Sequence, residues 1–162
     1  MKKRYTEYRW IWLLVMAATV GFIWQQSTLP PADSAATSDA VGEVIVPIVG
    51  GPTSPLGSFV ERFLRKIAHF VEFAALGIES EAYLAYRHTP PRTALQVGFG
   101  LLIAATDECL QLFTKRGAAI TDVLLDTGGF LAGAIAFRLL LFLVGLCFGK
   151  GGAFGGTEKE NV

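Results

Sequence analysis

Long uncharged stretches dominate this sequence. No Asp, Glu, Lys or Arg lies between Trp10 and Trp24, and Arg138 is the only charged residue from Thr127 to Phe148. A helix needs about 20 mostly apolar residues to cross roughly 30 Å of hydrocarbon. Hydrophobic residues make up 52% of the chain and charged residues only 17%, below the roughly 25% that is typical of soluble domains. We therefore expect an integral membrane protein, with the lipid bilayer as a partner.

The charge balance and the cysteine content exclude two other classes of protein. Fourteen basic residues face fourteen acidic ones, and no basic block dominates, so we expect no nucleic-acid partner. Two cysteines are too few for a scaffold held together by disulfides.

The order of apolar and polar stretches predicts an all-α fold, an integral membrane four-helix bundle. The predicted units are a cytoplasmic stretch with the first transmembrane helix (1–25), an extracytoplasmic loop (26–57), a three-helix core (58–148) and a disordered cytoplasmic tail (149–162). The loop is rich in Pro, Ser, Thr, Asp and Gly and has no helical period. Its apolar patch, Val44 to Val49, is expected to form a short strand or to lie at the membrane interface.

The expected helix boundaries follow from local signals. Ser58 followed by Glu61 resembles a capping box, which predicts that the second span begins there and continues to about Tyr86. The third span is expected from about Thr93 to Phe113, and the fourth from about Thr121 to Phe148.

Basic residues beside the spans predict the orientation. Lys2, Lys3 and Arg4 precede the first span, which places both termini of a multi-pass cell-membrane protein in the cytoplasm. The same cluster is also found in signal peptides, so the sequence leaves open whether the first helix is retained or cleaved. We expect a retained anchor, because its apolar run is at the long end of the usual 7–15 residues.

Polar residues from three spans are expected at one depth. A charged group inside a span costs at least about 2.5–3.5 kcal/mol, so such residues mark function by default. With a helical rise of 1.5 Å per residue, the predicted topology places the polar residues of these spans in the outer third of the bilayer. A basic residue of the cluster lies in the loop between spans three and four. The predicted functional cluster consists of Lys66, His69, Glu72, Asp107, Glu108, Gln111, Arg116, Asp122 and Asp126.

The fourth span also carries a packing pattern. Gly129 and Gly133 stand four residues apart, which lets another helix approach closely. Arg138 lies near the middle of this span and is expected to pair with Glu79 or Glu81 across the bundle, with Glu79 preferred.

Four separated motifs resemble the VanZ-like family of bacterial membrane proteins. They read Lys66-x-x-His69-x-x-Glu72, Asp107-Glu108-x-x-Gln111-x-Phe113, Arg116, and Asp122-Val123-x-x-Asp126-x-x-Gly129-x-x-x-Gly133. The resemblance implies a small four-helix protein with a possible link to resistance against the glycopeptide teicoplanin, as in the founding member, and an unsettled molecular activity. This chain departs from the family in having Asp126 where Asn is usual, and Lys115 where Gly or Pro is expected.

Several functions fit the predicted cluster at this point. Its residues are either interhelical contacts of a structural or interaction protein, or a site for an anionic envelope lipid or cell-wall precursor. In the lipid interpretation His69, with Asp107 or Glu108, can serve as acid and base if chemistry follows binding. Five basic residues are predicted on the extracytoplasmic side, where the orientation rule disfavours them. They support the site for an anionic lipid or precursor: Arg62, Arg65, Lys66, Lys115 and Arg116.

Two further interpretations stay open. A small proton or cation conductor would need a homo-oligomer, since four spans are few for a transporter. A metal-dependent hydrolase would use Asp107, Glu108, Asp122 and Asp126 around magnesium. No single motif is specific for a metal, so we assign no metal ligands, no cofactor and no catalytic residue.

Overall fold

The computed structural model describes residues 9–87, 93–114, 117 and 119–148, and within them it is entirely helical. The five helices are α1 (Arg9–Thr28), α2 (Pro31–Ile48), α3 (Pro55–Tyr86), α4 (Thr93–Phe113) and α5 (Ile120–Phe148). The predicted all-α class is confirmed, and the expected limits of the third and fourth spans agree with α4 and α5 to within one residue.

Three of these helices are long and apolar enough to cross a membrane. They include the segments Trp10–Thr28, Thr93–Phe113 and Ile120–Leu146. Helix α3 has 32 residues, but charged side chains recur along it and it falls outside this group. The described residues thus form five helices with three candidate spans, and the second predicted span, which falls on α3, stays a prediction.

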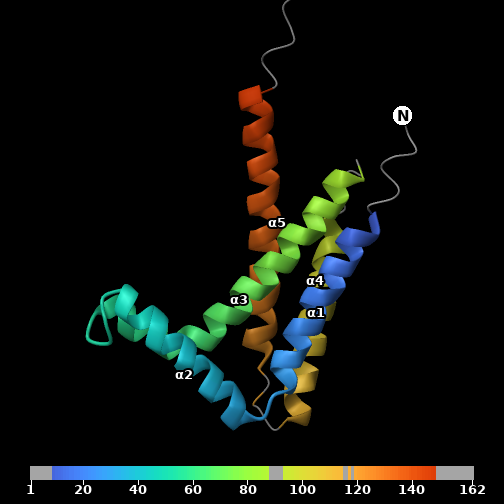
Figure 1. Cartoon of the computed structure of the whole chain (residues 1–162). Coiled ribbons are helices and arrows are strands. Elements are labelled where there is room, and N and C mark those ends of the chain that lie inside the picture. The colour runs from blue at the N-terminus through green and yellow to red at the C-terminus, as the bar shows by residue number, and fades with distance from the viewer. Residues whose placement is uncertain (1–8, 88–92, 115–116, 118, 149–162) are drawn as a thin grey trace, which may run out of the picture.

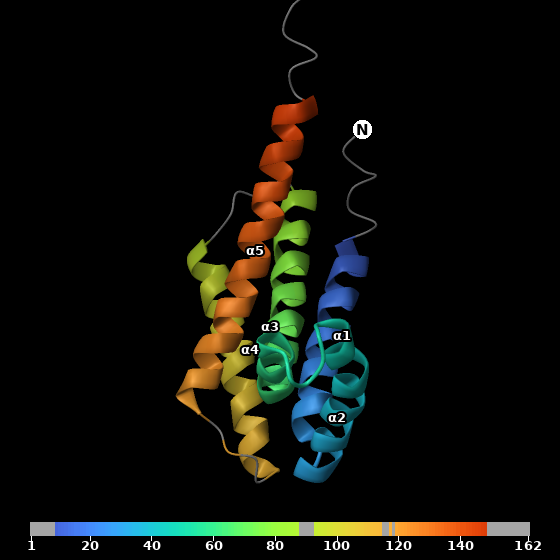
Figure 2. The ribbon, with the colours of Figure 1, turned by 90° about the vertical axis from the view of Figure 1, so that its left-hand side faces the viewer.

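Helix α3 is the centre of the fold. It packs most extensively against α5 and also against α1 and α2, while α4 packs against α5 and α1. Figure 1 shows α1 and α4 side by side and α5 rising past them, with α2 at the beginning of α3. In the turned view, α1, α3, α4 and α5 run lengthwise through the molecule (Figure 2). The end of α4 and the beginning of α5 both lie toward the lower end of the two views.

Glycines bring the backbones of α3 and α5 into contact. A Cβ atom on Gly133 would lie 1.9 Å from the carbonyl oxygen of Ala74, and one on Gly77 would lie 2.0 Å from that of Phe130. Gly129 faces the carbonyl oxygen of Phe70 in the same way, at 2.5 Å. Only residues without a side chain permit this approach, which fixes α3 and α5 against each other. The two glycines of α5 were predicted as packing residues, whereas Gly77 was not.

The core is a small apolar cluster between these helices. Its buried members are Ile23, Phe73, Leu76, Ile103, Ala104 and Phe130. By contrast, many large apolar side chains on α1, α4 and α5 are exposed, such as Leu14 (68%), Leu102 (63%) and Phe142 (61%). An exposed apolar surface of this extent fits contact with lipid better than contact with water.

The predicted loop at 26–57 is wrong over most of its length, because residues 31–48 form α2. Pro31 occupies the first turn of α2, Asp33 follows in the same turn, and both residues favour a helix N-terminus. Several alanines follow, and Pro47 falls near the end of the helix, so nothing interrupts it earlier. The segment Val44 to Val49 is therefore the end of a helix and not a strand.

The predicted capping box at Ser58 is also wrong. The N-cap of α3 is Ser54, whose Oγ accepts a hydrogen bond of 2.9 Å from the backbone N–H of Gly57. Pro55 follows at the first helical position, where a missing N–H does no harm. Ser58 lies one turn inside the helix and donates to the carbonyl oxygen of Pro55. Gly50 and Gly51 have φ angles of 105° and 82° and make the tight turn from α2 to α3.

Candidate functional site

Most of the residues predicted as functional come together where α3, the second half of α4 and the beginning of α5 meet. We use the name polar cluster for the members that the structure describes: Lys66, His69, Glu72, Asp107, Glu108, Gln111, Asp122 and Asp126. They come from α3, α4 and α5. Arg116, the ninth predicted member, and its neighbour Lys115 lie outside the described residues, as does the predicted tail.

An ion pair joins the first half of α3 to the first turn of α5. The Nζ atom of Lys66 donates to Oδ1 of Asp122. The Lys66 side chain is 45% exposed and that of Asp122 is 19% exposed, so the pair lies at the rim of the polar cluster. A carboxylate in the first turn of a helix is also stabilised by the helix dipole.

Gln111 holds the acids of α4 in place. Its Nε2 atom donates to Oδ2 of Asp107 (3.0 Å) and to Oε1 of Glu108 (3.2 Å). The other oxygen of Glu108 accepts a 3.0 Å hydrogen bond from the backbone N–H of Ala119. This contact ties the end of α4 to the residue just before α5. Asp107, Glu108 and Gln111 are each at most 5% exposed.

The deepest part of the polar cluster contains one residue from each of three helices. His69 (α3), Asp107 (α4) and Asp126 (α5) each place a potential ligand atom within 4.8 Å of the other two. The Nδ1 atom of His69 lies 3.7 Å from Oδ2 of Asp107. Asp107 is 0% exposed and Asp126 is 1% exposed. Two acids are thus fully buried beside an imidazole ring.

Glu72 faces a different neighbourhood. It lines a cavity of about 200 Å³ between α1, α2 and α3, together with Phe22, Leu64 and His69. His69 therefore borders both this cavity and the deep part of the polar cluster.

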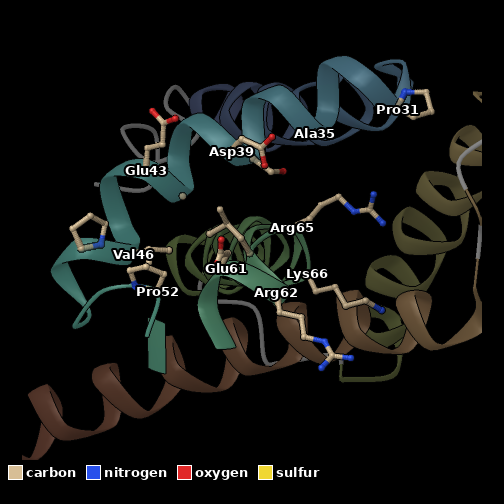
Figure 3. Close-up of a pocket in the computed structure, with 14 residues that line it drawn as sticks. Pro31, Ala35, Asp39, Glu43, Val46, Pro52, Glu61, Arg62, Arg65 and Lys66 are labelled. Carbon is tan, nitrogen blue, oxygen red and sulfur yellow. The ribbon is translucent and has the colours of Figure 1, made fainter. Parts of the chain in front are cut away.

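A larger groove lies between α2 and α3, with a volume of about 760 Å³. Three basic residues of α3 line it, namely Arg62, Arg65 and Lys66. Figure 3 shows their side chains extending to one side of the groove, with α2 across from them. The sequence did not predict this groove, because its second wall was expected to be a loop.

A separate polar network lies toward the opposite end of α3. Arg138 forms two hydrogen bonds with Glu81, of 3.1 and 2.8 Å, and one of 3.2 Å with Oε1 of Gln96. The preferred pairing of Arg138 with Glu79 is wrong, since Glu79 accepts a hydrogen bond from Thr19 of α1 instead. Sequence reasoning missed Gln96, although it is the only polar side chain between Thr93 and Thr106. A lone polar residue in an apolar span generally indicates a partner on another helix.

Comparison with known proteins identifies the family. The model of the VanZ/LLP1 family matches residues 10–142, which is most of the chain. No curated protein and no solved structure matches the sequence. The family match extends over α1 to α5 and includes every member of the polar cluster, so the VanZ-like resemblance of the four motifs is confirmed. The chain belongs to the VanZ/LLP1 family.

Proposed function

We propose that this protein binds an anionic lipid of the cell envelope, or a lipid-linked cell-wall precursor, in the groove between α2 and α3. The observation that carries the proposal is the set of three basic residues on one wall of the groove, Arg62, Arg65 and Lys66. They lie beside helices that are apolar enough to span a membrane.

The two arginines supply the contact with phosphate. In the described part of the chain neither Arg62 nor Arg65 forms an ion pair with an acid, whereas Lys66 is paired with Asp122. A guanidinium group binds phosphate oxygens through two parallel hydrogen bonds. The guanidinium carbon of Arg62 lies 5.6 Å from the centre of the Phe63 ring, within the range of a cation–π contact. Arg62 and Arg65 are therefore available to a negatively charged headgroup.

Apolar surface beside the groove suits the lipid chains. On α2, Val41, Val44 and Ile48 are exposed, with 44%, 65% and 78% of their surface accessible. The neighbouring 200 Å³ cavity shares Leu64 and Arg65 with the groove and adds Phe22 of α1 to the apolar lining. An acyl or polyprenyl chain can thus remain in apolar contact while its phosphate reaches the arginines.

Acidic residues in the same groove restrict which lipid headgroups would fit there. Asp39 and Glu43 of α2 and Glu61 of α3 also line it. A simple phosphate would leave these carboxylates without a partner. A headgroup that adds amine or hydroxyl donors to its phosphate would satisfy both the basic and the acidic side chains, which favours a lipid-linked precursor.

The proposal also covers the placement in the membrane. We place the polar cluster and the groove on the outer side of the cell membrane and both termini in the cytoplasm, in a multi-pass arrangement with α3 as a further span. Sequestration of an envelope lipid at that surface would alter susceptibility to glycopeptide antibiotics. This is the form in which we propose a link to resistance.

The competing account is that the polar residues only hold the helices together. The contacts of Gln111 and the pair of Lys66 with Asp122 support it, since interhelical hydrogen bonds contribute about 0.6 kcal/mol each on average. Arg62 and Arg65 make no ion pair in the described residues; that account leaves no role for Arg62, whereas Arg65 lines a small hollow together with Glu108. The two accounts therefore differ in what these arginines do.

The test compares a phosphorylated polyprenyl lipid with the neutral polyprenol of equal chain length. The purified protein is reconstituted in nanodiscs of neutral lipid, and binding is measured by native mass spectrometry. We expect the wild-type protein to prefer the phosphorylated lipid at least tenfold. Each basic residue near an anionic headgroup contributes about 1 kcal/mol, so the Arg62→Gln, Arg65→Gln variant should lose about 2 kcal/mol, or roughly 30-fold in affinity.

Arg87→Gln is the matched control, because Arg87 ends the same helix far from the groove and contacts Tyr83. It should bind like the wild type. Equal affinity of the wild-type protein for the charged and the neutral lipid would contradict the proposal. An unchanged preference in the double arginine variant would contradict it as well.

A further inference from the structure

We propose that His69, Asp107 and Asp126 bind one divalent transition-metal ion, of the Zn²⁺ or Mn²⁺ class, between α3, α4 and α5. None of its three residues lines the groove of the lipid proposal, although Arg65 and Lys66 line both that groove and a small hollow beside His69 and Asp126.

The spacing of the three side chains fits a shared ion. Their potential ligand atoms all lie within 4.8 Å of one another, and the His69 Nδ1 to Asp107 Oδ2 distance is 3.7 Å. That distance is too long for a hydrogen bond. Two ligands of one tetrahedral ion with bonds of about 2.1 Å lie roughly 3.4 Å apart. The His69–Asp107 pair would need a shift of only a few tenths of an ångström, and no pair in the set, at most 4.8 Å apart, would need more than about 1.4 Å.

Buried oxygen atoms provide an independent indication of a ligand. Asp107 is 0% exposed and Asp126 is 1% exposed, and within the described ranges Oδ1 of each lacks a hydrogen-bond partner. A buried carboxylate oxygen without a partner is disfavoured, and buried charges in proteins are generally paired or coordinate metals. Lys66 forms its ion pair with Asp122 and not with these two acids. An ion between His69, Asp107 and Asp126 would balance the charge of the two buried acids.

The surroundings have two further features of a metal site. Gln111 donates to Oδ2 of Asp107, which orients that carboxylate as outer hydrogen bonds do for metal ligands. A hollow of about 10 Å³ borders His69 and Asp126 and also Asp122 at the rim, which is about the space of one water molecule. It offers room for one water ligand.

The donor set decides the class of ion. Mg²⁺ and Ca²⁺ prefer shells of oxygen alone, whereas an imidazole nitrogen suits zinc and other transition metals. One nitrogen with two carboxylates therefore favours Zn²⁺ or Mn²⁺ over Mg²⁺.

The experiment uses the full-length protein in detergent, with its affinity tag removed and its metals stripped by a chelator. Zn²⁺, Mn²⁺ and Mg²⁺ are titrated separately by isothermal calorimetry, and thermal unfolding is recorded with and without each ion. We expect one equivalent of Zn²⁺ or Mn²⁺ to bind at least 100-fold more tightly than Mg²⁺. We also expect that ion to raise the unfolding temperature.

Asp126→Asn and His69→Gln should each weaken binding at least tenfold and abolish the thermal stabilisation. Glu79→Gln is the matched control, since Glu79 is also a carboxylate of α3 with a buried unpaired oxygen but lies elsewhere in the bundle. It should bind the ion like the wild type. Absence of saturable binding by the wild-type protein would overturn the proposal whether or not the variants fold. Unchanged affinity in a folded Asp126→Asn variant would overturn it too.

Discussion

Replacing Gly133 with alanine tests the contact on which the whole arrangement depends. A Cβ atom there would lie 1.9 Å from the carbonyl oxygen of Ala74, whereas carbon–oxygen contacts across helices are about 3.3–3.6 Å long. The two backbones would have to separate by about 1.5 Å. Because backbone atoms cannot rotate away, we take the upper end of the usual overpacking cost, about 3 kcal/mol. Alanine recovers about 1 kcal/mol of helix propensity, so the net loss should be about 2 kcal/mol.

Gly128→Ala is the control, because a Cβ atom on Gly128 would meet nothing within 4 Å. That variant should gain up to about 1 kcal/mol from propensity alone. The free energy of unfolding is measured for both variants by reversible denaturation in mixed micelles. The expected difference between them is about 3 kcal/mol. If Gly133→Ala proved as stable as Gly128→Ala, the close packing of α3 on α5 would be refuted.

Three further substitutions have expected outcomes. Arg138→Gln should cost about 3 kcal/mol of stability because it leaves Glu81 buried without its cation. Adding Glu81→Gln should recover part of this loss. No recovery in the double variant would contradict the pairing. Ser54→Ala should cost about 1 kcal/mol as the loss of an N-cap, while Ser58→Ala should cost clearly less, and thermal unfolding of the two variants compares them. Lys66→Gln should change stability by no more than about 1 kcal/mol, since the Lys66 side chain of the ion pair is about half exposed. The variant should still bind the phosphorylated lipid more weakly. A larger loss of stability with unchanged lipid binding would favour a purely structural role for Lys66.

The fold could be predicted where one signal dominates. The limits of α4 and α5 follow from hydropathy alone, because a membrane span has few competing structures. The sequence from 31 to 48 has no such signal. Its Ser, Thr, Pro and Asp content indicates a loop, yet its prolines fall at the two ends where a helix tolerates them, and packing against α3 supplies the rest of the stability. Local composition cannot report that tertiary contribution.

Which side chains pair across helices was harder to predict than how deep each residue lies in the bundle. Glu79 and Glu81 lie at similar depths in α3 but on different faces, so the sequence could not decide which one meets Arg138. The choice depends on how α3 is rotated against α5, and Gly77 fixes that rotation through its contact with Phe130. The glycine pair of α5 was recognisable from its spacing. Its counterpart on α3 is a single glycine, which carries no pattern.

The candidate site likewise has a part that could be predicted from the sequence and a part that could not. Residues of α3, α4 and α5 could be assigned to one level from helix rise alone. The groove could not, since it requires α2. The acids Asp39 and Glu43, which narrow the expected headgroup, were placed in a loop and therefore were not considered.

The central claim is that side chains from separate helices meet at one end of the bundle, and chemical cross-linking tests it most directly. Lys66→Cys and Asp122→Cys are combined in a background without native thiols, made by Cys109→Ser and Cys147→Ser, and treated in membranes with a short bifunctional thiol reagent. We predict efficient cross-linking within one chain for this pair, and none when Arg87→Cys replaces Lys66→Cys as the partner of Asp122→Cys. Failure of the first pair to react, or equal reaction of both pairs, would contradict the shared site.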